Sequence, residues 1–539
     1  MNTYGKSLGF ILGLIGLIAP VAQASEFEDF AKNEMEMFTQ YRDERDAEFI
    51  SFLKAQWQEF QAYKGLVRDT TPKPKRVPNA SVVVTSKSDS DASTDTKETT
   101  PEKKIETSVV EKIVVPRLPE TLPSESEGLP TEELSSGETQ GETPEVEALR
   151  EIAPAPAFKP VMEPQISLTS EPFVGVAFEF FGSDYSFAGD FKFPHVTMSG
   201  AVKEVVSDYW EKMSQCDYEA FLSKVGRVKK KQELNDWGYH ALLYSAGMKI
   251  HGGDRDLANL FVWFMSLKSG YDAKAGYSDE RVYLLLPSRN RLYGVSYLTI
   301  KGMRYYAMTF DGTKEKLTRL FTYKASYPRS NKLMDYRILK TPTLAPEIVD
   351  KELSFDYSGE KQLIHISYNK ALVTYFENYP QTNIKIYFDA GTSRELDYTM
   401  VRELQKVLEG KSEVEAVNYL LGFVQKAFKY KTDDAQLGHE KYMLPEETLW
   451  YPYSDCEDRS FLFAYLVRKV LKLDVVGLNY PGHVATAVRF SDNISGDYVV
   501  TNNRKYIVCD PTYINASAGM AMPQFKRRNP DVVKIRNWR

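Results

Sequence analysis

The sequence predicts an α+β protein built from several separate parts. Helical periodicity and strand-like alternation fill different stretches of the chain. The chain has 539 residues, of which 42% are hydrophobic and 13% aromatic, enough for more than one buried core. Its formal net charge is -6, from 68 basic and 74 acidic residues, so no global charge excess favours a nucleic-acid partner. Three cysteines and six histidines, without a CxxC pair, argue against a disulfide scaffold and against a structural zinc module.

Residues 1–24 have the pattern of an export signal. Lys6 precedes an apolar run over 8–19, and the small residues of Ala22-Gln23-Ala24 suit signal peptidase. The run is shorter than the roughly 20 apolar residues of a spanning helix, and no later segment is long and apolar enough to span. We therefore expect a cleaved signal peptide and a mature protein that is periplasmic and not transmembrane.

Residues 25–65 are predicted to form one long amphipathic helix. Aromatic side chains recur at mostly helical spacing between charged ones, and neither glycine nor proline occurs before Gly65. Such a stripe must be covered by coiled-coil self-association, by the protein's own body, by a partner protein or by a membrane surface. The stripe consists of Phe27, Phe30, Met37, Phe38, Tyr41, Phe49, Phe52, Trp57, Phe60 and Tyr63.

Residues 66–165 are predicted to be a disordered acidic linker. Serine, threonine, glutamate and proline dominate this segment, and 101–150 alone holds twelve glutamates against five lysines or arginines. A chain of this composition cannot bury enough apolar surface to fold. We expect it to tether the N-terminal helix to the folded part of the protein.

Two folded parts are predicted next, an α+β domain over 166–340 and a β-rich segment over 341–398. In the first, helical periodicity covers 200–269, with breaks near Cys216, at 227–231 and near Gly252. Strand patterns follow at 282–286, 292–300 and 304–310. The second part is assigned to strands at 353–357, 363–368 and 384–388.

The last part, residues 399–539, begins with a predicted pair of helices in which Ser412 and Glu415 form a capping box. A further helix is predicted over 461–470, where apolar residues lie on all sides. Cys456 then falls at or beside the N-terminus of this helix, where the helix dipole favours thiolate over thiol. Strands are predicted at 475–478, 484–488, 497–501 and 506–509.

Cys456, His483 and Asp510 follow one another at equal intervals of 27 residues, each at the start or end of a predicted element. A thiolate can attack a carboxamide carbonyl, an imidazole can move the proton, and a carboxylate can fix the imidazole tautomer. Adjacent strands can place His483 opposite Asp510, and a helix end can present Cys456 to both.

These motifs together resemble the transglutaminase-like superfamily. The resemblance covers about 400–515 and rests on Asp-Cys-Glu-Asp around Cys456, the apolar helix that follows, Gly-His-Val around His483, and a strand that runs into Asp510-Pro-Thr. It implies a papain-like core in which a helix packs on an antiparallel sheet. It also implies a catalytic triad in which Cys456 is the nucleophile, His483 the general base and acid, and Asp510 the residue that orients it.

The resemblance extends to two further features of the site. The backbone N–H of Cys456 would contribute to an oxyanion hole, with Trp450 or Tyr451 as a second donor. In similar periplasmic cysteine proteinases, acidic residues beside the nucleophile bind calcium, which makes Asp455 and Glu457 candidate calcium ligands. The alternative role of these carboxylates is to stabilise the helix N-terminus. No other cofactor is expected.

The predicted function is an exported cysteine hydrolase that cleaves amide bonds through a thioester. By analogy with the family, the substrate is a peptide or protein, with a peptidoglycan stem as one candidate. An amine acceptor in place of water would give a cross-linking acyltransferase instead. A non-catalytic periplasmic scaffold is the alternative that the long helix and the tether favour.

A faint internal repeat links 166–340 to the C-terminal part. Aligning Asp254 with Asp458 puts Gly252 at the place of Cys456 and Asp279 at the place of His483. The earlier domain would then be a degenerate transglutaminase-like copy without catalytic residues.

The three cysteines, Cys216, Cys456 and Cys509, are predicted to be free thiols. Catalysis requires Cys456 to be free, and no sequence feature brings Cys216 within disulfide distance of Cys509.

Overall fold

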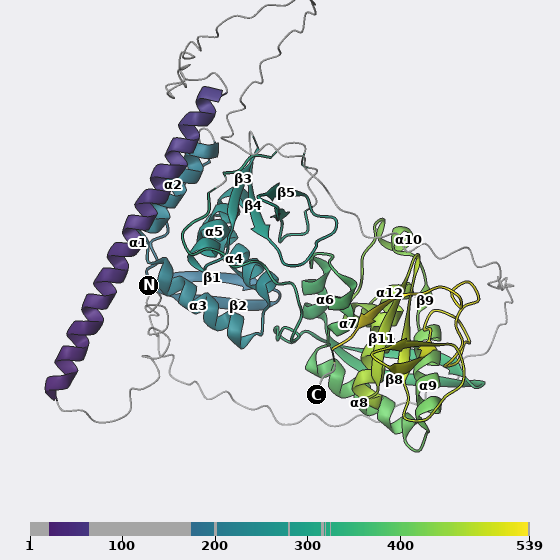
Figure 1. Ribbon diagram of the computed structural model, residues 1–539. Coiled ribbons are helices and arrows are strands. Elements are labelled where there is room, and N and C mark those ends of the chain that lie inside the picture. Colours follow the sequence, from purple (N-terminus) through teal and green to yellow (C-terminus); the bar gives the residue numbers. More distant parts are fainter. Residues whose placement is uncertain are drawn as a thin grey trace, which may run out of the picture.

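The protein is described by a computed structural model that covers residues 21–63, 174–198, 202–278, 281–313, 317, 320–323 and 325–536. These residues form a long helix, a first body (174–340) and a second body (348–536), which lie side by side (Figure 1). The architecture is α+β, with helices packed on antiparallel sheets. Most of the predicted signal peptide and the whole predicted linker lie outside the described residues.

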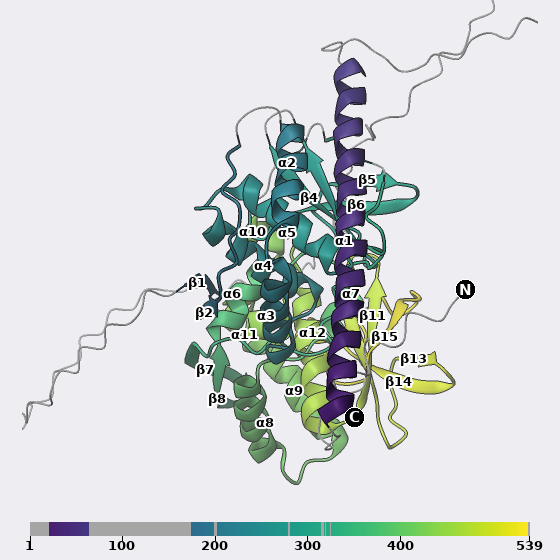
Figure 2. The ribbon, with the colours of Figure 1, turned by 90° about the vertical axis from the view of Figure 1, so that its left-hand side faces the viewer.

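The long helix α1 (Val21–Tyr63) runs along the flank of the first body, as Figure 2 also shows. Phe49 and Leu53 are buried against that body, and the carboxylate of Asp46 forms a buried ion pair with Lys268. The sequence left open whether this helix packs on another copy, a partner, a membrane or the protein's own body. For this half of the helix, the structure shows packing on the protein's own body. Met35 and Met37, nearer its start, are exposed.

The first body consists of four helices, a hairpin and a four-stranded sheet. The helices are α2 (Val202–Ser214), α3 (Tyr218–Lys231), α4 (Asp236–Ile250) and α5 (Arg255–Lys268), and the hairpin is β1 (Gly175–Phe180) and β2 (Ser183–Ala188). The sheet contains β3 (Lys274–Tyr277), β4 (Val282–Pro287), β5 (Tyr297–Ile300) and β6 (Met303–Met308), in the order β3-β4-β6-β5 with antiparallel neighbours. The predicted helical stretch and its breaks near Cys216 and Gly252 are confirmed, whereas β3 was not predicted. The break predicted at 227–231 is wrong, because α3 continues to Lys231 and ends only at its C-cap Gln232.

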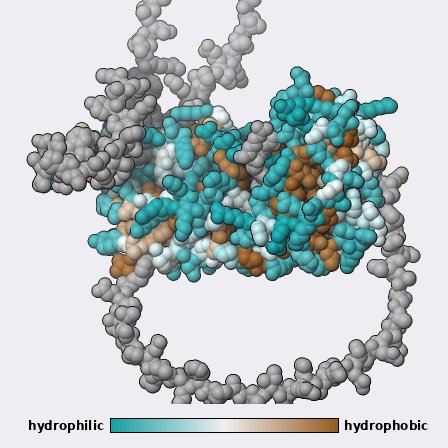
Figure 3. Space-filling model, turned by 90° about the horizontal axis from the view of Figure 1, so that it is seen from below, coloured by the Kyte–Doolittle hydropathy of each residue, from teal (hydrophilic) through white to brown (hydrophobic). Residues whose placement is uncertain are grey.

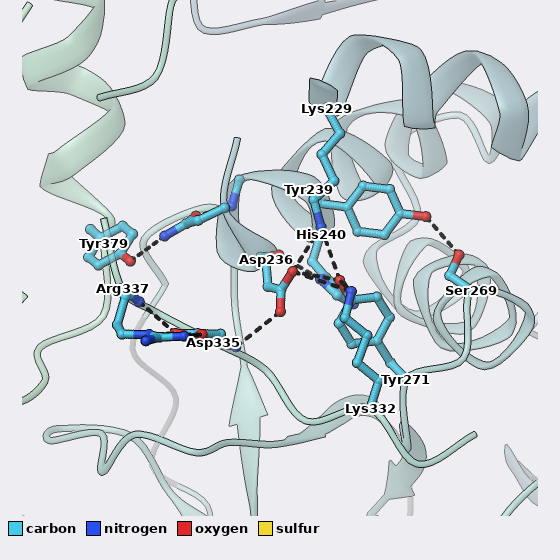
Figure 4. A network of polar contacts seen from close by, with 12 residues as sticks. Lys229, Asp236, Tyr239, His240, Ser269, Tyr271, Lys332, Asp335, Arg337 and Tyr379 are labelled. Carbon is cyan, nitrogen blue, oxygen red and sulfur yellow. Dashed lines mark hydrogen bonds and ion pairs between the residues drawn. The ribbon is translucent and has the colours of Figure 1, made fainter. Parts of the chain in front are cut away.

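A buried polar network holds the helices of the first body to the segment after its sheet (Figure 4). Asp236 at the start of α4 accepts hydrogen bonds from Lys229 Nζ at 2.8 Å and from Tyr271 Oη at 2.6 Å. Its other oxygen accepts the backbone N–H of Asp335 at 3.1 Å. Lys332 also donates to Tyr271. The carboxylate of Asp236 is neutralised by the two lysines, Lys229 and Lys332. We therefore interpret this network as structural, stabilising the packing of the first body.

The second body begins with a hairpin, β7 (Ile348–Tyr357) and β8 (Glu360–Asn369). The predicted β-rich segment is only partly strand, because Ile384 to Phe388, predicted as a strand, forms the short helix α7 (Ile384–Asp389). Asn383 caps that helix by accepting the N–H of Lys385, and Phe388 packs edge-on against Phe461. A short apolar run suits either a strand or a buried helical turn, so its periodicity could not decide between them.

The remaining helices lie on one side of a five-stranded antiparallel sheet, as Figure 2 shows. They are α6 (Lys370–Glu377), α8 (Arg394–Leu408), α9 (Glu413–Lys426), α10 (Asp433–Leu437), α11 (Pro445–Trp450) and α12 (Cys456–Leu466), with a π-helical turn at Val467–Leu471. The strands are β11 (Asp474–Tyr480), β12 (His483–Arg489), β13 (Tyr498–Thr501), β14 (Arg504–Cys509) and β15 (Asp531–Lys534), in the order β13-β14-β12-β11-β15. The short strands β9 (Lys429–Tyr430) and β10 (Tyr453–Ser454) pair beside it. The Ser412–Glu415 capping box before α9 is confirmed.

The two bodies share one strand topology. After α5 the chain makes β3 to β6, and after α12 it makes β11 to β14; in both sheets the third strand pairs with the fourth, the fourth with the second and the second with the first. The predicted alignment of the two bodies, Asp254 with Asp458, is wrong by three residues, as the starts of α5 and α12 show. The N-cap residues are Asp254 and Asp455, so Arg255, not Gly252, corresponds to Cys456. Asp279 lies outside the described residues.

Figure 3 shows the underside of the two bodies, where hydrophilic side chains predominate and the largest apolar area lies over the second body. Among the helices in the described ranges, none combines the length and the apolar character that crossing a bilayer requires.

The buried carboxyl of Glu446 predicts a measurable pH dependence of stability. Burial raises the pKa of Glu446 from 4.5 to about 7, although Ser393 and Asn369 donate hydrogen bonds to it. Because the folded pKa exceeds the unfolded one, stability falls as the pH rises from about 4.5 to 7, by about 3 kcal/mol from this group. The Glu446→Gln variant has no carboxyl to titrate at this position. The difference in unfolding free energy between variant and wild type should therefore shift in favour of the variant as the pH rises from about 4.5 to 7. The measurement is denaturant unfolding of both proteins at the two pH values. An equal change in unfolding free energy for wild type and variant would contradict the raised pKa of Glu446.

Candidate active site

Cys456 is the first residue of α12. Asp455 caps the helix by accepting the N–H of Asp458, whose side chain in turn accepts the N–H of Asp455. All residues of α12 are buried, which the apolar stretch from Phe461 onward predicted and which also holds for the polar residues 457–460 of its first turn. Ser460 Oγ donates to the carbonyl of Val484 at 2.9 Å and so fixes the helix to the start of β12.

His483 and Asp510 lie on neighbouring strands, and their side chains meet. The tight turn at Gly482, whose φ is 79°, places His483 directly opposite Tyr480 at the start of β12. β14 ends at Cys509, which pairs with Thr486 of β12, so Asp510 follows beside His483. His483 Nε2 and Asp510 Oδ2 are 2.8 Å apart. The predicted juxtaposition of these two residues is therefore present.

The orientation of Asp510 is fixed by its other polar atoms. Its Oδ1 accepts the backbone N–H groups of Thr512 at 2.9 Å and Tyr513 at 3.2 Å. Its carbonyl accepts Gln425 Nε2 at 3.1 Å. With Nε2 of His483 held by this carboxylate, Nδ1 is the ring nitrogen left to exchange a proton.

Cys456 lies beside the His483 strand, but its thiol is turned to an acidic neighbour. The backbone N–H of Val484, the residue after His483, is close enough to the sulfur to favour its thiolate. The thiol itself donates to Glu457 Oε2 at 2.7 Å. Among the described residues, no hydrogen bond joins Cys456 to His483.

The charge state of Cys456 differs from the sequence-based expectation. Burial first of all, and then the negative charges of Glu457 and Asp455, raise the pKa of the Cys456 thiol well above its ordinary value. The helix dipole, which favours thiolate by a modest amount at the first turn, is outweighed by these neighbours. The raised pKa favours a thiol at Cys456 rather than the thiolate that we expected.

The expected second oxyanion donor finds no support. The backbone N–H of Tyr451 donates to the carbonyl of Glu447 at 2.9 Å, and its hydroxyl donates to Glu377 at 2.9 Å. The ring of Trp450 packs against Tyr368 with centroids 5.6 Å apart. Both residues are thus engaged in holding α11 to the rest of the second body.

An acidic cluster adjoins the N-terminus of α12. Carboxylate oxygens of Asp433, Glu440 and Asp455 lie within 4.8 Å of one another, so these residues could hold a metal ion. Asp433 is 2% exposed and its Oδ1 has no hydrogen-bond partner among the described residues. Burial is the main cause that raises the pKa of Asp433 to about 7 and that of Asp455 well above its usual range.

This cluster agrees only in part with the predicted calcium ligands. Asp455 belongs to it, whereas Glu457 faces the thiol of Cys456. Asp433 and Glu440 were missed because they lie more than a dozen residues upstream, at the start of the short helix α10 and in the loop that follows it. The adjacent acidic residues Asp433 and Asp434, with Glu440 a few residues later, were the signal that could have drawn attention to them.

The site is closed to solvent. Cys456 is 2% exposed, His483 4% and Asp510 2%. The ring of Phe525 stacks on the imidazole of His483, with centroids 4.8 Å apart and planes inclined by 16°. Sequence reasoning did not single out Phe525, since it lies in a stretch without helical or strand periodicity.

All three cysteines are free thiols, and Cys509 is completely buried next to Asp510. No family model, curated protein or solved structure matches the chain.

Proposed function

We propose that the protein is a transglutaminase-like cysteine hydrolase that cleaves amide bonds of peptides or proteins, exported to the periplasm. The observation that carries the proposal is the contact of 2.8 Å between His483 Nε2 and Asp510 Oδ2, with Cys456 at a helix start beside the same strand. Two acid–base groups from neighbouring strands are in contact, and a thiol from a third element lies next to the backbone of Val484, the residue after His483. A thiol, a base and an orienting carboxylate are the groups that nucleophilic acyl transfer requires.

In the proposed mechanism, His483 Nδ1 accepts the thiol proton of Cys456 as the sulfur attacks the amide carbonyl. The bond between carbon and nitrogen then breaks, His483 returns the proton to the leaving amine, and a thioester remains on Cys456. Water, deprotonated by His483, attacks the thioester and releases the acid and the thiol. Asp510 keeps the imidazole oriented and stabilises its charged form throughout.

For this mechanism the thiol must leave Glu457 and turn to His483. The high pKa of Cys456 keeps the resting site unreactive, because the thiolate is the nucleophile. Binding of substrate against the helix N-terminus, or neutralisation of the neighbouring carboxylates, would lower that pKa.

We propose that the carboxylates of Asp433, Glu440 and Asp455 bind calcium, with Glu457 next to them. An all-oxygen set suits a hard divalent cation, and the buried Oδ1 of Asp433 without a hydrogen-bond partner fits a ligand atom. The cation would supply positive charge beside Cys456.

We also propose that the first body is a degenerate copy of the catalytic domain. Its sheet has the same strand order, but Arg255 takes the place of Cys456 and Val282, the first residue of β4, takes that of His483. Arg255 forms an ion pair with Asp311 at 2.8 Å. A nucleophile and a base are thus both lacking at the corresponding position.

A non-catalytic scaffold is the second candidate function, because Cys456 is almost fully buried and its thiol is hydrogen-bonded to Glu457.

Alkylation by iodoacetamide separates the two functions, since it reports the thiolate directly. Because the pKa of Cys456 is raised, we expect its reaction to begin at a higher pH than that of an ordinary cysteine, and His483→Ala to slow this reaction at least about tenfold. Partly exposed Cys216 and buried Cys509 serve as internal references, resolved by peptide mass spectrometry. Labelling of Cys456 that is no faster than that of Cys509, or independent of His483, would favour the scaffold.

A further inference from the structure

The segment between Asp510 and β15 covers the candidate active site without forming a helix or strand of its own. It leaves β14 at Cys509 and returns to the sheet at Asp531, where β15 pairs with β11. Phe525 is buried to 7% exposure, while Gln524 and Lys526 on either side of it are exposed. Up to Ala521 the segment is tied to the body, because Gly519 donates to Val508 of β14 and Asn515 and Ala518 donate to side chains of α9. After Ala521, Phe525 is the buried aromatic contact, and at the surface Lys526 pairs with Asp497 at 3.2 Å.

The ring of Phe525 lies in contact with the acid–base group of the site. It stacks on His483 and also packs on Tyr480, at a centroid distance of 4.9 Å. The guanidinium of exposed Arg528 lies over the Phe525 ring, 5.7 Å from its centroid. The ring is thus sandwiched between the imidazole and a cationic side chain at the surface.

The backbone around Phe525 is held mainly within the segment. The N–H of Phe525 donates to the carbonyl of Met522 at 2.9 Å, and the carbonyl of Phe525 accepts the N–H of Arg528 at 3.0 Å. Both bonds survive if the segment moves as a unit. Segments of this kind, with few backbone ties to the core, open at lower free energy than the sheet they cover.

The space that Phe525 fills is apolar and is bordered by small residues. Ala485 and Ala487 lie on the same face of β12 as His483, because side chains alternate along a strand. Together with Phe525 they belong to a buried apolar cluster, whose other members are Val476, Leu478, Tyr480, Tyr506, Val508 and Ala521. Removal of the ring would leave an apolar pocket directly beside the imidazole.

We propose that residues 522–530 form a lid over His483, and that Phe525 occupies the pocket which accepts an aromatic or large aliphatic side chain of the substrate. This inference rests on the proposed hydrolase function and names its substrate class: peptides with a bulky apolar residue next to the scissile amide. The substrate side chain replaces the Phe525 ring against Tyr480 and Ala485, so the apolar surface exposed by opening is covered again.

The lid is tested by the rate at which iodoacetamide alkylates Cys456 in the full-length protein. We expect Phe525→Ala to raise that rate at least about tenfold, because the barrier to opening is the burial of this ring. Phe490→Ala is the matched control: Phe490 is similarly buried, at 8% exposure, but follows the far end of β12. It should leave the rate within about twofold of the wild type.

A second variant covers the case in which Phe525→Ala does not fold. Arg528→Ala removes the cation from the outer face of the ring without making a cavity, and should raise the alkylation rate by about two- to fivefold. If neither Phe525→Ala nor Arg528→Ala, where folded, changes the alkylation rate of Cys456, the lid proposal is wrong.

Peptide hydrolysis tests the pocket. The wild type should cleave a peptide with phenylalanine at the scissile bond at least about tenfold more efficiently, as kcat/KM, than the same peptide with glycine. Faster alkylation without hydrolysis of any peptide would support the lid and overturn the hydrolase. Hydrolysis without preference, together with unchanged alkylation, would overturn the lid and leave the hydrolase standing.

Discussion

Replacing Cys456 by alanine should abolish amide hydrolysis, with a loss of at least about 10³-fold in kcat, while the protein stays folded. Without the sulfur no thioester can form, and His483 and Asp510 alone have no nucleophile to activate. The change removes one sulfur atom from a site whose neighbours, Glu457 and Val484, keep their own places in α12 and β12. The thermal midpoint should therefore move little.

The measurement is a peptidase assay beside a thermal unfolding curve, with Cys216→Ala as the matched control. Cys216 lies in the first body, where its thiol donates to the carbonyl of Lys192 at 3.2 Å. That variant should retain full activity. A folded Cys456→Ala protein with the activity of the wild type would refute the mechanism.

Calcium should stabilise the protein at neutral pH, and Asp433→Asn should remove most of this effect. At a hundredfold excess over its dissociation constant, a ligand that binds only the folded state adds about 2.7 kcal/mol to the unfolding free energy. The physical reason is that Asp433, Glu440 and Asp455 crowd their carboxylates within 4.8 Å in a largely buried place. A cation relieves their mutual repulsion.

Denaturant unfolding with calcium and with a chelator gives this shift directly. The matched control is Asp434→Asn, because Asp434 is exposed on the same short helix and does not belong to the cluster. It should respond to calcium as the wild type does. An equal response of Asp433→Asn would place the cation elsewhere in the protein.

Much of the second body could be predicted because its signals are local. The capping box at Ser412, the buried helix that follows Cys456 and the strands on either side of His483 each follow from residues close in sequence. The contact between His483 and Asp510 also follows, since a hairpin and the strand that pairs with it leave few other arrangements.

The features that sequence reasoning missed depend on packing. The run from Ile384 to Phe388 has the composition of a strand, but contact with Phe461 and the cap at Asn383 make it a helix. The partners of Asp455 in the acidic cluster come from α10 and the loop after it, which only the folded chain brings near α12.

The protonation state of Cys456 depends on packing in the same way. Its position at a helix start indicated a thiolate, and that argument considered the dipole alone. The fold adds complete burial and two flanking carboxylates, which act in the opposite direction and prevail. Such a balance cannot be read from the four residues around the cysteine.

The pairing of β15 with β11 has a consequence for intermolecular association. β11 is largely buried and rich in apolar residues, and without β15 its backbone N–H and C=O groups would form an open edge of the sheet. Open edges of this kind recruit strands from other molecules and lead to aggregation. β15 covers that edge and carries exposed charges at both its ends, Asp531 and Lys534. β15 thus prevents β11 from pairing with a strand of a neighbouring molecule.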